Sequence, residues 1–231
     1  METILVTGAS RGIGLEFCRH YAKSGCQVFA CCRTPGSAHA LVRLARQYPD
    51  IRMITLNVSD QDAVSQLAAD LSDTAIDILI NNAGVYGDDR SSGFGQLDYQ
   101  CWQDVLAVNT LAPVRITEAL LPNLIAGNKK LIVAITSKMG SIADNSSGGA
   151  IFYRTSKAAL NAAMKSLSLD LAHRGLGVLI LHPGWVRTDM GGPHALISTQ
   201  QSVQGMSHLM NNFTMRDSGK FLDYSGNTIP W

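Results

Sequence analysis

The sequence carries almost no excess charge of either sign. Its 19 basic and 18 acidic residues nearly cancel along a chain of 231 residues. A protein that holds nucleic acid or an anionic membrane through its surface charge needs a clear basic excess. The composition therefore gives no electrostatic case for either partner.

Long apolar runs and ordered cysteine motifs are also missing. No apolar stretch approaches the ~20 residues that a membrane-spanning helix requires, and the N-terminal stretch lacks the basic and long apolar regions of a secretory signal. The five cysteines are an odd number, and none belongs to a C-x-x-C pair or to a Cys/His cluster with metal-ligand spacing. We therefore expect a soluble, cytoplasmic protein with reduced cysteines and no metal site.

The chain does contain a regular alternation of apolar runs and helical patterns. Strands that are apolar throughout are typical of a parallel sheet covered on both faces. Alternating strands and helices then predict one doubly wound, Rossmann-like α/β domain over residues 1–231, with helices on both faces. We expect about seven strands, within residues 3–8, 26–32, 51–58, 76–84, 129–137, 176–184 and 219–226. The helical patterns cover residues 12–23, 37–48, 59–72, 98–126 with an interruption near Pro113, and 152–175.

A glycine-rich turn follows the first predicted strand in the stretch VTGASRGIG, residues 6–14. Gly8 permits a tight turn, and the next helix directs its unpaired N–H groups and positive dipole end at the same space, which suits a pyrophosphate. Three residues separate Gly8 from Gly12, so the loop differs from G-x-G-x-x-G. The alternative is a tight turn without a ligand. The candidate residues of this loop are Gly8, Ser10, Arg11, Gly12, Ile13 and Gly14.

The end of the second predicted strand bears on the choice of cofactor. A site for NAD usually places a carboxylate near this point, where it binds the ribose 2′-hydroxyl. Here the sequence reads ACCRT, with Arg33 and no acid, and Arg11 lies in the glycine loop. Two guanidinium groups suit a 2′-phosphate, so we expect NADP. The alternative is that both arginines are solvated surface residues.

The stretch YRTSK places Tyr153 and Lys157 four residues apart, on one face of a predicted helix. A nearby ammonium favours the phenolate and lowers the pKa of a tyrosine, which then exchanges a proton with a carbonyl or alcohol. Ser137 follows the fifth strand, where its hydroxyl could hold the substrate oxygen or cap a turn. Such a pair also arises by chance, as a packed tyrosine beside an exposed lysine.

Two asparagine features complete the pattern. The stretch NNAG ends the fourth predicted strand, where Asn82, Ala83 and Gly84 bring backbone close to the cofactor. Asn109 lies in a largely apolar helical stretch, DVLAVNTLAP, and a buried asparagine needs hydrogen-bond partners. The alternative for Asn109 is a satisfied core residue.

Together these motifs resemble the short-chain dehydrogenase/reductase superfamily. TGASRGIG, NNAG, Asn109, Ser137, YRTSK and HPGWVRTDM occur in the family's order over essentially the whole chain. The segments RGIGLEF, YRTSKAALN, HPGWVRTDMGG and the final IPW are most similar to the C-factor and Sniffer-type carbonyl reductase branch.

The resemblance implies a role for each motif. Tyr153 is the general acid–base, Lys157 lowers its pKa and binds the nicotinamide ribose, and Ser137 polarises the carbonyl. Asn109 disturbs its helix and holds a water linked to Lys157. The glycine loop takes the pyrophosphate, residues 82–84 line the adenosine-ribose side, and Pro183, Gly184, Val186 and Thr188 flank the nicotinamide.

One position departs from the family pattern. The third strand ends LNVSD, so Asn57 and Val58 stand where the family usually has an aspartate and an apolar residue near the adenine. An asparagine amide still bonds the adenine amino group, so we expect cofactor binding to survive.

The sequence therefore favours an NADPH-dependent reductase of a small carbonyl compound. A cofactor-binding signalling or redox-sensing protein of C-factor type and an NAD-dependent alcohol dehydrogenase are the alternatives. The segment 190–207, MGGPHALISTQQSVQGMS, is expected to form a mobile lid over the substrate. Apolar residues on more than one side of the helices around 109–126 and 153–173 predict a homodimer or homotetramer.

Overall fold

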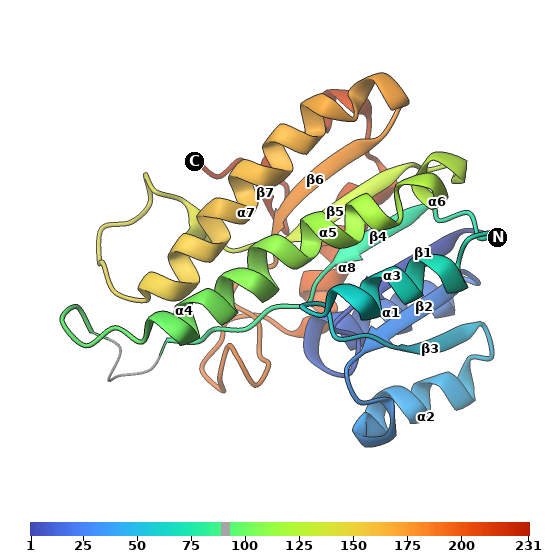
Figure 1. Ribbon diagram of the computed structural model, residues 1–231, viewed down its shortest axis with the longest axis horizontal. Helices are drawn as coiled ribbons and strands as arrows, with labels where there is room; N and C mark the ends of the chain where they lie inside the picture. The colour runs from blue at the N-terminus through green and yellow to red at the C-terminus, as the bar shows by residue number, and fades with distance from the viewer. Residues whose placement is uncertain (89–92) are drawn as a thin grey trace.

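A computed structural model describes residues 1–88 and 93–231 of the chain. Seven strands form one parallel sheet in the order β3-β2-β1-β4-β5-β6-β7. This confirms the doubly wound fold, and Figure 1 shows the sheet between two layers of helices. The strands are β1 Thr3–Thr7, β2 Gln27–Cys32, β3 Ile51–Thr55, β4 Ile78–Asn81, β5 Leu131–Ile135, β6 Gly177–His182 and β7 Phe221–Asp223.

The helices lie close to the expected ranges, with one exception described below. The α-helices are α1 Gly12–Lys23, α2 His39–Gln47, α3 Gln61–Asp70, α4 Tyr99–Leu106, α5 Ala112–Ala119, α6 Leu121–Ala126, α7 Ile151–Asp170 and α8 Thr199–Asn211. Short turns of helix are η1 Pro35–Ser37, η2 Ala107–Leu111, η3 Lys138–Gly140, η4 Ala172–Arg174 and η5 Met215–Asp217.

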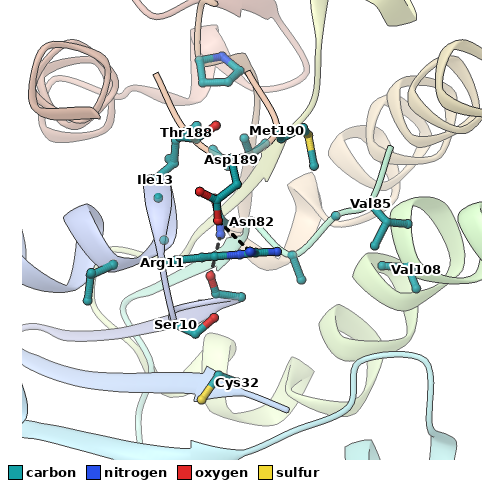
Figure 2. A pocket seen from close by; sticks show the side chains of 18 of the residues that line it. Ser10, Arg11, Ile13, Cys32, Asn82, Val85, Val108, Thr188, Asp189 and Met190 are labelled. Atoms are coloured by element: carbon teal, nitrogen blue, oxygen red, sulfur yellow. Dashed lines mark hydrogen bonds and ion pairs between the residues drawn. The ribbon is translucent and has the colours of Figure 1, made fainter. Parts of the chain in front are cut away.

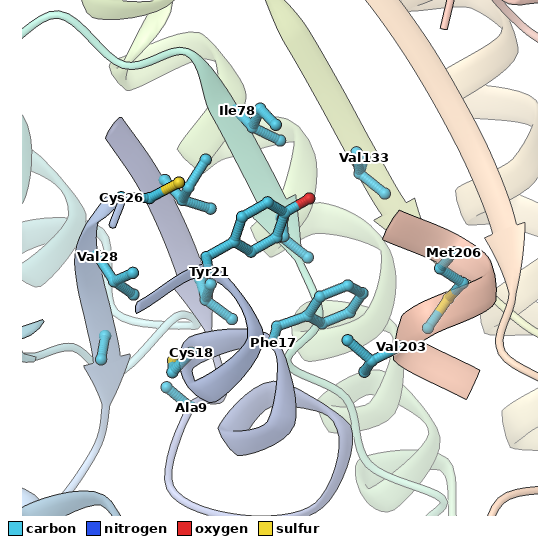
Figure 3. Packing of buried hydrophobic residues seen from close by; sticks show 14 of the residues in the cluster. Ala9, Phe17, Cys18, Tyr21, Cys26, Val28, Ile78, Val133, Val203 and Met206 are labelled. Atoms are coloured by element: carbon cyan, nitrogen blue, oxygen red, sulfur yellow. The ribbon is translucent and has the colours of Figure 1, made fainter. Parts of the chain in front are cut away.

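Helices α1, α2 and α8 cover one face of the sheet. Phe17 and Tyr21 of α1 are buried between the strands and α8, where Val203 and Met206 meet them (Figure 3). The other face is covered by α3, α5, α6 and α7, with Ile116 and Leu160 among the buried residues. The central strands β1, β4, β5 and β6 are buried on both faces, which explains why they are largely apolar, whereas the edge strand β3 exposes Arg52 and Thr55.

Helix α8 corrects the expectation of a mobile lid over residues 190–207. Residues 199–211 form a regular helix whose Val203, Met206 and Met210 are buried against the sheet and α1. The helix begins with a capping box, in which Ser198 and Gln201 exchange side-chain and backbone hydrogen bonds. A polar composition rich in serine and glutamine concealed a narrow apolar stripe, so only residues 190–198 remain outside helix in this segment.

The long helical region before β5 is interrupted at two places. Residues Ala107–Leu111 form a π-helical turn between α4 and α5, and Leu120 separates α5 from α6. The π turn contains Asn109 and comes directly before Pro113, close to where the sequence predicted a break. Such turns are frequent at functional sites because they redirect one side chain within a helix.

Candidate active site

A cavity of about 640 Å³ lies at the carboxyl ends of the strands, between β1 and β4. The chain continues from β1 to helix α1 on one face of the sheet and from β4 to the helices on the other face. This is the topological switch point at which doubly wound folds bind ligands. The structure brings sixteen of the predicted residues to its wall: Gly8, Ser10, Arg11, Gly12, Ile13, Gly14, Arg33, Asn57, Val58, Asn82, Ala83, Gly84, Tyr153, Lys157, Pro183 and Thr188.

The glycine loop is shaped to admit a close ligand and a close helix. Gly8 has φ of +68°, a conformation that residues with a Cβ rarely adopt. A Cβ on Gly14 would collide with the Gly8 carbonyl and lie 2.6 Å from Asn82 Nδ2, so this glycine lets α1 pack closely on the strands.

Asn82 fastens the glycine loop to the end of β4. Its Nδ2 donates to the carbonyl oxygens of Thr7 at 2.9 Å and Gly8 at 3.2 Å. The Thr7 hydroxyl accepts in return from the backbone N–H groups of Asn82 and Ala83, both at 3.0 Å. These bonds hold one wall of the cavity rigid, and a cradle of this kind fits the pyrophosphate and adenosine of a dinucleotide.

The two arginines predicted to select the cofactor differ in their surroundings. Arg11 Nη1 lies 2.6 Å from Asp189 Oδ2, in an ion pair across the cavity mouth (Figure 2). Arg33 lines the cavity and makes no ion pair with any residue in 1–88 or 93–231. Both side chains of the Arg11–Asp189 pair are largely exposed, and an exposed pair of this kind is worth only about 0.2–1 kcal/mol, so Asp189 holds Arg11 weakly.

Tyr153 and Lys157 lie on the buried face of α7, one turn apart, and both reach the cavity. Lys157 Nζ donates to the Ile135 carbonyl at 2.9 Å and lies 5.7 Å from the centroid of the Tyr153 ring. Thr136 Oγ1 donates to Asn161 Oδ1 at 2.7 Å and joins the end of β5 to the same helix. The lysine is thus fixed beside the tyrosine by contacts with β5.

Burial dominates the titration of both groups. It raises the pKa of Tyr153 to about 12, although a hydrogen bond with the Ser137 hydroxyl acts in the opposite direction. Burial lowers the pKa of Lys157 to about 8. Tyr153 is therefore a protonated phenol at neutral pH and Lys157 an ammonium, which is the state required to donate a proton. The sequence predicted a lowered Tyr153 pKa, and here desolvation of the phenolate outweighs its neighbours.

Ser137 lies beside the cavity wall and acts in two ways. Its Oγ accepts from Met139 N–H at 3.1 Å and so caps η3, which is the alternative role that the sequence left open for this serine. The same hydroxyl interacts with Tyr153 in the direction that lowers the pKa of the phenol, so Ser137 lies beside the tyrosine as well.

Asn109 is completely buried behind Gly84 and Lys157. Its Oδ1 accepts from Val85 N–H at 2.8 Å, and its Nδ2 donates to Val85 O at 2.8 Å and Ser156 Oγ at 2.9 Å. Both amide donors are occupied, so the side chain fastens the segment after β4 to α7.

Four predicted residues do not line the cavity: Asn109 and Ser137, described above, and Gly184 and Val186. Gly184 has φ of +84° in the turn after β6, and a Cβ there would lie 2.6 Å from Ile197 Cδ1. Val186 is buried and pairs with Ile197. Both residues shape the segment after β6, whose neighbouring residues Pro183, Arg187 and Thr188 line the cavity.

The sequence missed several residues that line the cavity. Cys32 at the end of β2 and the apolar side chains of Val85, Val108 and Met190 also line it (Figure 2). Arg187 and Asp189 also reach the wall, from the stretch WVRTDM that the sequence had singled out for Val186 and Thr188.

No group of acidic, histidine or cysteine side chains with the geometry of a metal site occurs in the described ranges. Across those same ranges, none of the helices has both the length and the apolar character to cross a membrane.

A glycine-loop cavity at the switch point of a parallel sheet, with a tyrosine and a lysine on one helix beside it, is typical of Rossmann-type oxidoreductases. The chain belongs to the short-chain dehydrogenase family, whose model matches residues 2–196. This family accounts for the order of motifs along the whole sequence.

Relatives and solved structures agree with this assignment. C-signal of Myxococcus xanthus is 46% identical over 156 residues, 68% of this chain and 93% of that protein. The 1-hydroxy-2-glutathionyl-2-methyl-3-butene dehydrogenase of Rhodococcus sp. strain AD45 is 36% identical over the full length of both. NADPH-bound carbonyl reductase from chicken fatty liver is 34% identical, with a TM-score of 0.91 over 100% of this chain and 99% of that one. Carbonyl reductase Sniffer of D. melanogaster is 33% identical, with a TM-score of 0.92 and complete coverage of both chains.

Proposed function

We propose that the protein is an NADPH-dependent reductase that converts an aldehyde or ketone to an alcohol. The observation that carries the proposal is the placement of Tyr153 and Lys157 together at the wall of a glycine-loop cavity, with Lys157 Nζ 5.7 Å from the centroid of the Tyr153 ring. NADPH-bound and NADP-bound neighbours and the carbonyl reductases among them support the same reaction class.

In this proposal the bound cofactor supplies a hydride from its nicotinamide to the carbonyl carbon. Tyr153 donates its phenolic proton to the carbonyl oxygen, and the Ser137 hydroxyl orients that oxygen beside it. The Lys157 ammonium favours the phenolate left on Tyr153. Asn109 holds the segment of Val85 against α7, and the glycine loop binds the pyrophosphate.

The residues around the adenosine extend the proposal. Arg33 binds the 2′-phosphate, because the end of β2 carries this guanidinium and no carboxylate that would repel the phosphate. Asn57, whose Oδ1 accepts from Ser59 Oγ at 3.0 Å, and the buried Val58 contact the adenine. Thr188 and Pro183 flank the nicotinamide.

The reaction is tested by incubating the protein with NADPH and each member of a panel of aldehydes and ketones. Turnover is monitored as the loss of absorbance of the reduced cofactor. At least one carbonyl substrate should be reduced at a kcat within the usual range of about 1–10³ s⁻¹. If NADPH binds while no carbonyl is turned over, the reductase proposal fails.

Binding of NADPH without turnover of any carbonyl compound would favour a signalling or redox-sensing role. The similarity to C-signal keeps this candidate in view. The intact set of Ser137, Tyr153 and Lys157 favours the enzyme, because a protein that only binds the cofactor has no need of a proton donor.

The Lys157 pKa gives a prediction for the pH dependence. The ammonium is charged below about pH 8 and loses its proton above it, while Tyr153 stays protonated until about pH 12. The kcat/KM for NADPH reports the free enzyme, so it should be level below pH 8 and fall above it. The residual activity of a Lys157→Arg variant should lack that limb, because an arginine stays charged. A wild-type profile that is flat to pH 10 would contradict the role of Lys157.

We also propose that the protein forms a homodimer through α5 and α7, which lie side by side on one face of the sheet (Figure 1). Ile116, Leu120 and Leu160, part of the predicted apolar arc, are buried in the chain's own core. Leu111 and Leu169 remain 55% and 66% exposed. These two side chains are the apolar surface that a second copy would cover.

Light scattering at micromolar concentration tests the assembly. The wild-type protein should have about twice the chain mass of 24.8 kDa, and a Leu169→Asp variant should shift toward the single-chain mass. A wild-type species at the single-chain mass would show that the dimer proposal is wrong.

A further inference from the structure

The helix that carries Tyr153 has no cap of its own. Gly148, Gly149 and Ala150 precede α7 with φ of +65°, +65° and +47°, and Ala150 stands at the N-cap position, where its methyl group accepts no hydrogen bond. The first N–H groups of a helix have no partners inside it, so an acceptor must come from elsewhere.

Asp88, from the segment that follows β4, supplies that acceptor. Its Oδ1 accepts from the Phe152 N–H at 3.1 Å, and its Oδ2 accepts from the Tyr153 N–H at 2.8 Å. A carboxylate at this position also interacts favourably with the positive end of the helix dipole. The cap therefore joins two segments that are 64 and 65 residues apart in the sequence.

The segment around Asp88 is itself held in place. Val85 is fastened through both of its backbone groups to Asn109 in the π turn. The Tyr86 ring lies against the Tyr153 ring, with 5.0 Å between the centroids. Residues 85–88 thus form a rigid connection between Asn109, the Tyr153 ring and the first turn of α7.

We propose that Asp88 is a positioning residue for the proton transfer, which caps α7 from outside and so fixes Tyr153. The inference rests on the proposed role of Tyr153 as proton donor. Tyr153 is the third residue of α7, and its own amide is one of the two that Asp88 holds. Lys157 lies a full turn deeper and is held by Ile135. Loss of the cap therefore affects the phenol more than the site of the cofactor.

A matched control exists at the start of α3. Asp60 is the N-cap residue of that helix and also accepts two backbone bonds, both with its Oδ1, from Asp62 N–H at 2.9 Å and from Ala63 N–H at 3.1 Å. Asp60 does not line the cavity. Asp88→Ala and Asp60→Ala each remove two capping bonds and one negative charge, so a general loss of helix capping should lower the melting temperature in both.

The kinetic test compares these variants with saturating NADPH. Asp88→Ala should lower kcat at least tenfold and leave the dissociation constant of NADPH within twofold, while Asp60→Ala leaves kcat within twofold. Asp88→Asn keeps one acceptor oxygen and should recover part of kcat. A kcat of Asp88→Ala within twofold of wild type overturns the proposal. So does an equal loss of kcat in Asp60→Ala.

Amide hydrogen exchange provides a readout that needs no substrate. In Asp88→Ala the amides of Phe152 and Tyr153 should exchange at least tenfold faster, with those of Asp62 and Ala63 unchanged, and Asp60→Ala should show the reverse. Unchanged exchange at Phe152 and Tyr153 overturns the cap even if the protein reduces carbonyls. Faster exchange with a wild-type protein that reduces no carbonyl substrate leaves the cap standing but refutes its role in proton transfer, along with the proposed function.

Discussion

Replacing Tyr153 by phenylalanine is expected to lower kcat for carbonyl reduction by about 10²–10⁴-fold, the usual contribution of a general acid. The ring would still fill its buried position against Tyr86, so the fold and the cavity should persist. The dissociation constant of NADPH should stay within a few-fold of the wild-type value. Steady-state kinetics and fluorescence titration of NADPH measure the two quantities separately.

Tyr21→Phe is the matched control for this variant. Tyr21 is also buried, with its hydroxyl 3.6 Å from Met210 Sδ in the cluster between α1 and α8, and it does not line the cavity. Removing that hydroxyl should leave kcat near the wild-type value. A Tyr153→Phe variant that keeps kcat within tenfold of wild type would show that the proton comes from another group.

Reversing the charge of Arg33 is expected to change the choice of cofactor. The wild-type protein should favour NADPH over NADH, because a guanidinium at the end of β2 binds a 2′-phosphate and no acid competes for it. A charge-assisted hydrogen bond is worth about 1.5–3 kcal/mol, so Arg33→Asp should lower the ratio of kcat/KM for NADPH to that for NADH by at least about 10- to 100-fold.

Arg43→Asp separates this contact from the change in overall charge. Arg43 is exposed on α2 and does not line the cavity, and its replacement changes the net charge by the same amount. It should leave the cofactor ratio within about twofold of wild type. Equal use of NADPH and NADH by the wild-type protein would contradict the assignment of Arg33, and so would an equal shift in Arg43→Asp.

Much of the fold could be predicted because the central strands are buried on both faces and are therefore largely apolar. Helix α8 could not, because its apolar stripe of Val203, Met206 and Met210 lies among serines and glutamines. The pair of Ser198 and Gln201 three residues apart was the available signal. The disturbance of the helix at Asn109 was expected only from the family resemblance, because a single asparagine does not define where a π turn falls in a helix.

Some residues of the candidate site could also be predicted from the sequence, and others could not. Residues that lie next to a strand end, such as Gly8 and Asn82, could be predicted because the carboxyl ends of parallel strands meet at one edge. The ion pair of Arg11 with Asp189 joins residues 178 apart, and Asp88 reaches α7 from more than 60 residues away. Such contacts depend on how the loops pack, which neither periodicity nor a local motif encodes.

The titration of Tyr153 also required the structure. Spacing placed the phenol and the Lys157 ammonium together, but the depth of burial sets the balance between desolvation and charge. Because burial prevails, the phenol stays protonated at neutral pH, which is the state from which the proposed proton transfer would start.

The most direct test of the central claim is transfer of deuterium from labelled NADPH to the product of a substrate identified in the carbonyl panel. NADPH carrying deuterium at one or the other face of nicotinamide C4 is supplied in separate reactions, and the alcohol is examined by NMR. The proposed reaction predicts one deuterium on the carbinol carbon from one of the two labelled cofactors and none from the other. An alcohol that carries no deuterium from either cofactor would contradict direct hydride transfer in this cavity.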